Sequence, residues 1–422
     1  MLEVSESIRL FVDEAEADCA EAFARLNAIE RANTRKVLDA FQRHRISARH
    51  FAPTTGYGYD DIGRDTLSEM FAELMGCEAA LVRPQIASGT HALALCLYGI
   101  LRPGDVMMAA SGKPYDTLEE VIGISGTPGS GSLKEYGIGY EQVDLLPDGS
   151  MNVEEIIRRL KANPAVRLIE IQRSRGYDWR DSMSIEQIKE VTAAIHAVRP
   201  DVVVMADNCY GEFTELLEPG DVGVDLIAGS MIKNPGGGIA PTGGYVAGRK
   251  DLVELVSYRL TSPGIGAEVG SYAGSYQPFY QGLFMAPHIV MQAVRTAVLA
   301  ARIFEKLGYE VSPRCNDPRY DIIQAIRFHS ADELIAFIQA IQMHSPVDSE
   351  AVPEPWDMPG YQDPVIMAAG TFVSGASIEL SADAPVRPPF NAYMQGALTY
   401  AHGRCGLEGA LAHMVNKGFI SL

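Results

Sequence analysis

The stretch from Val224 to Arg249, VDLIAGSMIKNPGGGIAPTGGYVAGR, constrains this chain more than any other. Two short apolar runs, 226–228 and 243–247, predict strands, and Lys233 lies in the loop between them. Glycines 236–238 follow this lysine, and because glycine is costly to order, the triplet indicates that something bulky approaches the backbone. A desolvated lysine is a nucleophile toward carbonyls, whereas a surface lysine beside a flexible turn has no such role. Other parts of the chain must distinguish these two alternatives.

The composition is that of a globular protein with a substantial core. Its 422 residues are 47% hydrophobic and 21% charged, enough for two or three domains. The net charge of −19 argues against nucleic-acid or anionic-membrane partners, which require a basic face. The acidic N-terminus lacks the apolar core of a signal peptide, and no run reaches transmembrane length without charges or helix breakers. Six scattered cysteines form neither a CxxC nor a zinc-spaced Cys/His cluster, so we expect a cytoplasmic protein without a metal site.

Helical segments alternate with short apolar runs, among them 79–84, 105–110, 166–171 and 202–205. This alternation predicts an α/β fold with a mainly parallel central sheet covered by helices on both faces. We assign residues 1–60 to an N-terminal helical arm and loop, 61–300 to a large domain, and 301–422 to a smaller α/β domain. The arm packs either on its own domain or on another subunit.

The smaller domain and the link to it have their own predicted elements. A long helix from Pro287 to Leu307 connects the two domains. Strands are expected near 322–328 and 377–380, and helices at 331–342 and 389–402.

Several groups with site chemistry follow the predicted strands, where ligands bind in open α/β sheets. Ser88-Gly89-Thr90 begins a helix and could hold an anion there, although a plain helix cap uses the same residue types. Asp207 ends an apolar strand and needs a partner, either structural or a protonated ring nitrogen of a cofactor. Tyr115 could stack on an aromatic ligand or simply pack. Arg173 and its neighbour Arg175 could hold an anionic group or form structural salt bridges.

These features together match the needs of pyridoxal 5'-phosphate (PLP). Its phosphate needs a helix N-terminus, its ring nitrogen needs an anion, and its aldehyde needs a lysine. The chain supplies a Ser-Gly-Thr segment, Asp207, and Ser230-x-x-Lys233, in that order. We therefore predict PLP as the cofactor.

The sequence also resembles the fold-type I PLP enzymes of cysteine and methionine metabolism. Within them it is most similar to the methionine γ-lyase-like group also labelled aluminium-resistance or cystathionine β-lyase proteins. The resemblance covers nearly the whole chain. It is carried by HFAPTTGYGYDDIGRDTLSEMFAELMGCEAALVRPQIASGTHAL, IEIQRSRGYDWR, MADNCYGEF, AGSMIKNPGGGIAPTGGYVAGR and QPFYQGLFMAPHIVMQA.

The resemblance implies roles for individual residues. It implies Lys233 as the Schiff-base lysine and Asp207 as the partner of the ring nitrogen. Ser88, Gly89, Thr90 and Ser230 become phosphate contacts, and Tyr115 the tyrosine stacked on the ring. Tyr57 and Tyr59 fall in the loop that family members extend into a neighbour's site, which implies a homo-oligomer, dimer or tetramer.

The chain departs from the family pattern in its arginines. Better-studied carbon–sulfur lyases carry Tyr-x-Arg in that loop, whereas here Asp61 stands two places after Tyr59. The arginine that binds the substrate carboxylate has no motif-level match, so Arg387 is our candidate, with Arg404 behind it and Arg173 as a further possibility.

We expect a PLP-dependent carbon–sulfur lyase acting on a sulfur-containing amino acid of cystathionine or methionine type, by β- or γ-elimination. Lys233, held near neutrality by burial, would take the Cα proton, and Tyr57 or Tyr115 could donate a proton to the sulfur. Arg387 would clamp the carboxylate. The alternatives are an aldolase or aminotransferase reaction on the same scaffold, or a PLP-binding protein without catalysis.

Overall fold

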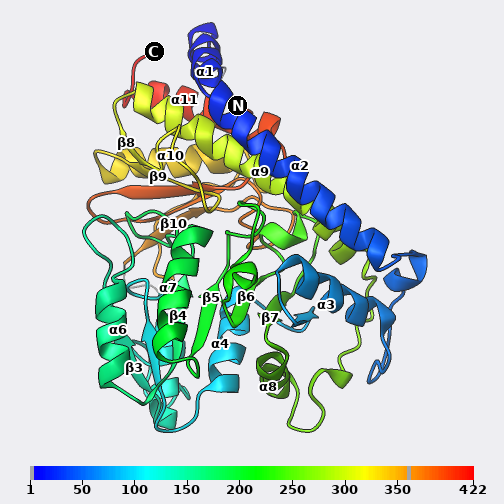
Figure 1. The fold of residues 1–422 in the computed structure, drawn as a ribbon. Helices are drawn as coiled ribbons and strands as arrows, with labels where there is room; N and C mark the ends of the chain where they lie inside the picture. The colour runs from blue at the N-terminus through cyan, green and yellow to red at the C-terminus, as the bar shows by residue number, and fades with distance from the viewer. Residues whose placement is uncertain (1–3, 359–362) are drawn as a thin grey trace.

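The computed structural model describes residues 4–358 and 363–422, and its larger sheet has seven strands (Figure 1). These are β1 (Ala79–Arg83), β2 (Val106–Ala109), β3 (Gly139–Gln142), β4 (Val166–Gln172), β5 (Val203–Asp207), β6 (Leu226–Ser230) and β7 (Gly244–Gly248). Their order is β1-β7-β6-β5-β4-β2-β3. The neighbours from β3 to β6 pair in parallel, and β7 is antiparallel to both β6 and β1.

Alternate side chains of these strands pack on opposite faces of the sheet. In β5, Val204 and Ala206 join one core cluster, while Val203 and Met205 join the other. The first cluster contains buried residues of α3 (Ile62–Leu74), α6 (Val153–Ala162) and α7 (Ile185–Val198). The second contains those of α4 (Gly89–Ile100), α5 (Asp116–Ile122) and α8 (Lys250–Leu260). The predicted mainly parallel sheet with helices on both faces is therefore confirmed.

The N-terminal arm packs on its own chain. Its helices α1 (Glu6–Asp18) and α2 (Ala20–Arg43), blue in Figure 1, run along α9 (Gln277–Lys306). Ile8, Val12 and Val37 are buried in the shared core. Of the two alternatives for the arm, the structure shows contact with its own domain.

The connecting helix α9 begins at Gln277, so the predicted start at Pro287 is wrong. Proline is common in a first turn, but Pro287 lies inside this helix, and the buried Phe279 and Leu283 extend the apolar face before it. By length and composition α9 could cross a membrane, but 78% of its most apolar window is buried in the fold, as in a core helix.

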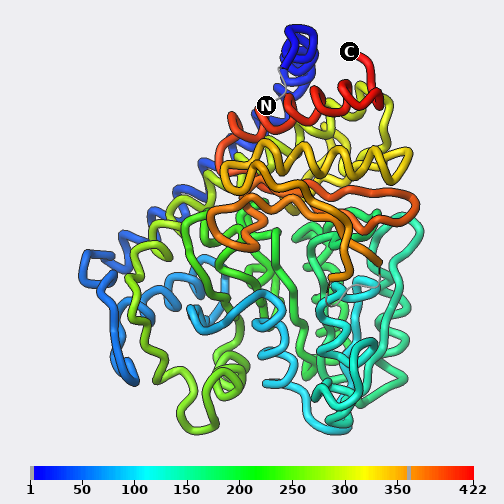
Figure 2. The backbone as a smooth tube through the Cα atoms, turned by 180° about the vertical axis from the view of Figure 1, so that it is seen from behind, coloured from blue at the N-terminus to red at the C-terminus, as the bar shows by residue number. Residues whose placement is uncertain are grey.

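The smaller sheet is antiparallel and lies between two helices and the larger sheet (Figures 1 and 2). Its strands are β8 (Glu310–Ser312), β9 (Ile323–Arg327), β10 (Val365–Ala368), β11 (Ser381–Pro385) and β12 (Asn391–Gln395), in the order β10-β11-β12-β9-β8. α9 and α10 (Ala331–Met343) pack on one face of this sheet, and α11 (Tyr400–Asn416) packs on these two helices. The other face looks toward the carboxyl ends of the larger sheet's strands.

Two predictions for this region are wrong. Residues 377–380 form turns rather than a strand, because the buried Glu379 carboxylate accepts the backbone N–H groups of Phe372 and Val373. Residues 391–395 form β12 rather than part of a helix, since pairing with β9 and β11 outweighs local propensity. The helix begins only after the cap at Thr399.

Short 3-10 helices complete the chain: η1 (Ala48–Phe51), η2 (Leu133–Tyr136), η3 (Pro219–Val222), η4 (Asn234–Gly236) and η5 (Gly266–Glu268). The predicted domain boundaries at residues 60 and 300 stay predictions.

Candidate active site

Lys233 lies just beyond β6, in the loop that leads into η4. Its amine is 4.0 Å from the centroid of the Tyr210 ring. Tyr210 lies in the loop after β5, the parallel neighbour of β6, so the carboxyl ends of two adjacent strands place the two side chains together. Tyr210 has a φ of 71°, a left-handed conformation that is uncommon for a bulky residue and is found at functional sites.

The three motifs identified in the sequence meet at this point. A Cβ atom built on Gly89, the first residue of α4, would lie 4.0 Å from Lys233 Nζ, 3.7 Å from Ser230 Cβ and 3.0 Å from Cys209 Sγ. Asp207 ends β5 two residues before Cys209, and its Oδ1 accepts the Cys209 N–H at 3.0 Å. The helix N-terminus, the aspartate strand and the lysine loop therefore surround one small volume.

The glycine triplet serves packing rather than ligand approach. A Cβ on Gly236 would lie 1.8 Å from the Met231 carbonyl oxygen, and one on Gly237 would lie 2.5 Å from the Gly282 carbonyl oxygen in α9. A Cβ on Gly238 would lie 2.2 Å from Leu398 Cδ2. The bulky groups near this backbone are thus α9 and the loop after β12, which fix the position of the lysine loop.

The Lys233 amine is held among acidic groups. Burial lowers its pKa, but Cys209, Tyr210, Asp207 and Glu212 raise it, and the pKa ends above its usual value. Burial and the acidic neighbours therefore act in opposite directions on this amine. The expectation that burial holds Lys233 near neutrality concerns the lysine released from PLP and stays a prediction.

Asp207 is buried at the end of β5 beside a second buried acid. Burial raises the pKa of Asp207, while Lys233 and the Cys209 N–H lower it. Glu170 lies on neighbouring β4, and burial together with the Asp207 charge raises its pKa to about 8. Asp207 is thus the group of this pair that is placed to carry negative charge next to Lys233.

The start of α4 fits the phosphate of PLP. Ser88 Oγ caps the helix by accepting the His91 N–H at 3.0 Å, and the helix N-terminus, with its positive dipole end, lies beside Lys233 at Gly89. Thr90 Oγ1 is 2.7 Å from Thr117 Oγ1, and Ser230 Oγ accepts the Ile232 N–H at 3.4 Å. Because Gly89 has no side chain, space remains between these hydroxyls and Lys233.

Lys233 opens into a cavity of about 230 Å³ between the two sheets. Tyr115, at the start of α5, lines it together with Thr90 and Tyr177, and the Tyr115 and Tyr177 ring centroids are 6.1 Å apart. The structure therefore brings Lys233, Asp207, Ser230, the 88–90 segment and Tyr115 to one place; their roles toward PLP stay predictions.

Two of the three candidate arginines lie elsewhere. Arg173 is fully buried and bound by Asn208 Oδ1 and Glu215 Oε2, each at 2.8 Å. Arg404 is paired with Asp13 and Glu16 of α1 and with Glu408. Both guanidinium groups are occupied by structural partners, so the structure does not bring them to Lys233.

Arg387 lies beside the cavity rather than inside it. It lines a small adjoining compartment with Lys113, Tyr115 and Tyr177, and it pairs with Asp363. Its side chain is 52% exposed. To bind a substrate carboxylate near Tyr115, Arg387 would have to break its ion pair with Asp363.

Tyr57 and Tyr59 do not line the Lys233 cavity of their own chain. They are 68% and 63% exposed, with ring centroids 5.5 Å apart. Asp61, which replaces the family's arginine, caps α3 by accepting the Arg64 N–H at 3.0 Å and also accepts the Tyr276 hydroxyl at 3.1 Å. This aspartate serves the loop's own structure, and contact with a neighbour's site stays a prediction.

Sequence reasoning missed Tyr210 and the contribution of the smaller sheet. Asp383 of β11 and Gln395 of β12 line the cavity with Lys233, and Gln395 Nε2 donates to Asp383 Oδ2 at 2.9 Å. Tyr210 had a signal, because it follows the Asp207 strand directly in DNCYGEF. Asp383 had none, because the apolar pattern predicts a strand at 377–380, whereas β11 begins at Ser381.

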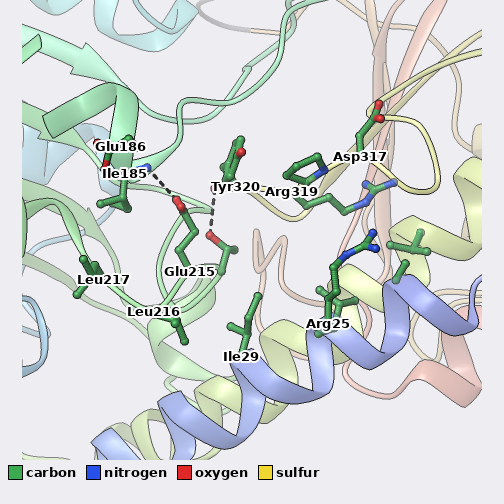
Figure 3. A pocket seen from close by; sticks show the side chains of 15 residues that line it. Arg25, Ile29, Ile185, Glu186, Glu215, Leu216, Leu217, Asp317, Arg319 and Tyr320 are labelled. Atoms are coloured by element: carbon green, nitrogen blue, oxygen red, sulfur yellow. Dashed lines mark hydrogen bonds between the residues drawn. The ribbon is translucent and has the colours of Figure 1, made fainter. Parts of the chain in front are cut away.

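A larger cavity, of about 450 Å³, lies away from Lys233 (Figure 3). Ile29 and Arg25 of α2 line it on one side and Leu216, Leu217 and Tyr320 on the other. None of the described residues that line it is a lysine, so the predicted chemistry has no place there.

Comparison with known proteins identifies the family. The methionine gamma-lyase profile matches residues 8–415, and the chain therefore belongs to this family of PLP-dependent enzymes. The Bacillus subtilis protein YnbB, whose function is uncharacterized, is 50% identical over 96% of each chain. A carbon-sulfur lyase involved in aluminum resistance from Clostridium novyi is 51% identical with a TM-score of 0.94, covering 97% of this chain and 96% of that one.

A more distant likeness concerns the fold alone. The PLP-dependent protein YhfS of Escherichia coli is 16% identical, with a TM-score of 0.62 over 93% of this chain and 97% of its own. The family and the fold-type I architecture recognised in the sequence are confirmed.

Proposed function

We propose that this chain is a PLP-dependent carbon–sulfur lyase that acts on a sulfur-containing amino acid by β- or γ-elimination. The observation that carries the proposal is the position of Lys233 Nζ. It lies 4.0 Å from a Cβ atom built on Gly89 at the start of α4, and its charge lowers the pKa of Asp207. The family, and the lyase named for the Clostridium novyi relative, support this class of reaction.

Lys233, Asp207, Ser230 and the 88–90 segment would hold PLP, and Tyr115 would lie beside its ring. When bound, PLP supplies an aldehyde for covalent attachment and a ring that withdraws electrons from the substrate Cα.

The chain's own side chains supply charge and protons. Asp207 places a negative charge at the end of β5, where it would stabilise a protonated ring nitrogen. Lys233 Nζ, once free of covalent attachment, accepts the Cα proton, while the Tyr115 hydroxyl, or Tyr57 from a neighbouring subunit, donates a proton to the departing sulfur. With water, the products are a thiol, a 2-oxo acid and ammonia.

Substitution of Lys233 tests the assignment. Lys233→Ala should abolish the visible imine absorption of the PLP-loaded protein and all thiol release, because Lys233 is the lysine among the described residues that line this cavity. Lys250→Ala, an exposed lysine at the start of α8, is the matched control and should leave both unchanged. Retention of either property by Lys233→Ala would refute the assignment.

The reaction type is tested by product analysis of the wild-type protein with a panel of amino acids. Thiol and 2-oxo acid formed in equal amounts support elimination. Aldehyde release would identify an aldolase, amino-group transfer an aminotransferase, and no turnover of any amino acid a non-catalytic PLP-binding protein.

A further inference from the structure

The smaller sheet directs a carboxylate at the Lys233 cavity. Alternate residues of a strand face the same side, and Ser381 and Asp383 of β11 both line this cavity. Ser381 is paired in register with Gln395 of β12. The Gln395 amide donates to Asp383 Oδ2 at 2.9 Å and to Ser381 Oγ at 3.4 Å, which fixes the carboxylate in place.

Asp383 and Lys233 are the charged side chains among the described residues that line this cavity. Burial raises the pKa of Asp383 to about 6, whereas the Gln395 hydrogen bond and Lys233 lower it. Asp383 is therefore ionised at pH 7.5. Asp383 is the acidic side chain among the described residues that line this cavity.

The adjoining compartment carries charges of both signs. It shares Tyr115 and Tyr177 with the Lys233 cavity, and it is lined by Lys113, Arg175 and Arg387 together with Asp116 and Asp178. Each of its three cations is paired with a carboxylate. Asp383 would repel the α-carboxylate of an amino acid, so this carboxylate is favoured on the side of the cavity away from β11. An extended amino acid therefore places its carboxylate near Tyr115 and its side chain toward β11.

We propose that Asp383 is a specificity-determining residue that binds an ammonium group at the distal end of the amino-acid substrate. The pairing of a fixed carboxylate with a buried ammonium compensates the desolvation of both groups. Among sulfur-containing amino acids, it favours a thioether that joins two amino acids over methionine, whose side chain is uncharged. This inference rests on the proposed function only in that an amino acid binds at Lys233.

The test compares L-ornithine with L-norleucine, which differ by an ammonium in place of a methyl group. Dissociation constants are measured from the change in visible absorption of the PLP-loaded protein at pH 7.5 and by calorimetry. The wild-type protein should bind ornithine at least about 10-fold more tightly, the scale of one charge-assisted hydrogen bond. Asp383→Asn should remove this preference by weakening ornithine binding alone, and Asp383→Glu should retain it.

Asp332→Asn, an exposed aspartate on α10, is the matched control and should preserve the ratio. The proposal is overturned if the wild-type protein does not distinguish the two ligands, or if Asp383→Asn weakens both equally, as a merely structural or charge-compensating role would require. Neither probe contains sulfur, so the result stands apart from the lyase proposal. Absence of thiol release with intact ornithine preference would refute the lyase and leave this site standing.

Discussion

At the scale of single residues, the site is built from acids that burial keeps from ionising. Burial raises the pKa of Glu170 and of Glu212 to about 8 each, and one oxygen of each carboxyl lacks a hydrogen-bond partner among the described residues. Such groups reduce stability at neutral pH and remain where function requires them. Here they lie near Asp207 and Lys233, the two groups on which the proposed chemistry depends.

Glu170→Gln should make the stability of the protein depend less on pH. The pKa of Glu170 rises from 4.5 to about 8 on folding, so as the pH rises between these values the unfolded chain ionises first and stability falls. Glutamine does not titrate, so the free energy of unfolding of the variant should rise relative to that of the wild type between pH 5 and pH 8. The expected rise is a few kcal/mol, at about 1.4 kcal/mol for each unit of pKa shift. Urea unfolding at the two pH values measures this difference.

Glu190→Gln, at an exposed position of α7, serves as the control and should show no such gain. An equal pH dependence for Glu170→Gln and the wild type would mean that Glu170 is ionised in the folded protein.

At the scale of elements, the site depends on where strands end and where one helix begins. β5 and β6 are adjacent and parallel, so Asp207 and Lys233 emerge at the same edge. α4 begins at Gly89 against that edge, and Ser88 caps it. The absence of a side chain at Gly89 is what keeps the helix N-terminus open toward the lysine.

Gly89→Ala should separate stability from cofactor binding. Gly89 has no positive φ that would strain alanine. The preference of a helix interior for alanine, about 0.5–1 kcal/mol, is opposed by the 3.0 Å approach of the new methyl to Cys209 Sγ, so thermal stability should change little. The new methyl would occupy the space between Cys209, Ser230 and Lys233, so PLP affinity should fall by about 10-fold or more, the effect of displacing one or two hydrogen bonds. Equilibrium dialysis with PLP and thermal unfolding measure the two effects.

Ser330→Ala is the control. Ser330 Oγ caps α10 by accepting the Glu333 N–H at 3.2 Å, so its loss should lower the free energy of unfolding by about 1 kcal/mol without changing PLP affinity. Wild-type PLP affinity in Gly89→Ala would show that the start of α4 is not the phosphate site.

At the scale of the whole molecule, the loop that carries Tyr57 and Tyr59 is held firmly although its rings are exposed. The Tyr57 carbonyl accepts the Gly270 N–H at 3.0 Å, and the Gly58 carbonyl accepts Arg64 Nη1 at 2.8 Å. Fixed, adjacent, solvent-exposed aromatic rings are typical of a protein interface. We therefore propose that this loop reaches the site of a second copy of the chain.

Subunit mixing tests that arrangement. Lys233→Ala and a Tyr57→Ala/Tyr59→Ala variant should each be inactive alone, because one lacks the lysine and the other the tyrosines of its neighbour's site. Half of the randomly mixed dimers should be hybrids of the two variants. Each hybrid has one of its two sites intact, so the mixture should recover about a quarter of wild-type activity. No recovery, with mixed dimers demonstrated by mass spectrometry, would place the tyrosines outside a shared site.

Much of the larger sheet and its site follows from local signals. The apolar runs that became β4, β5 and β6 are continuous and end in polar residues, so their positions and the edge they share could be predicted. The smaller sheet resisted prediction, because Ile378 and Leu380 are buried in turns and the 391–395 segment becomes a strand only by pairing with β9 and β11.

The sequence by itself determined the family, the α/β fold and the order of the motifs around Lys233, because these depend on local patterns and spacings. Only the tertiary structure decided that Arg173 and Arg404 serve structural ion pairs, that acidic side chains lie around the Lys233 amine, and that Asp383 lines the same cavity. The physical reason is that ion pairing, desolvation and strand register depend on groups far apart in the chain, which only the folded molecule brings together.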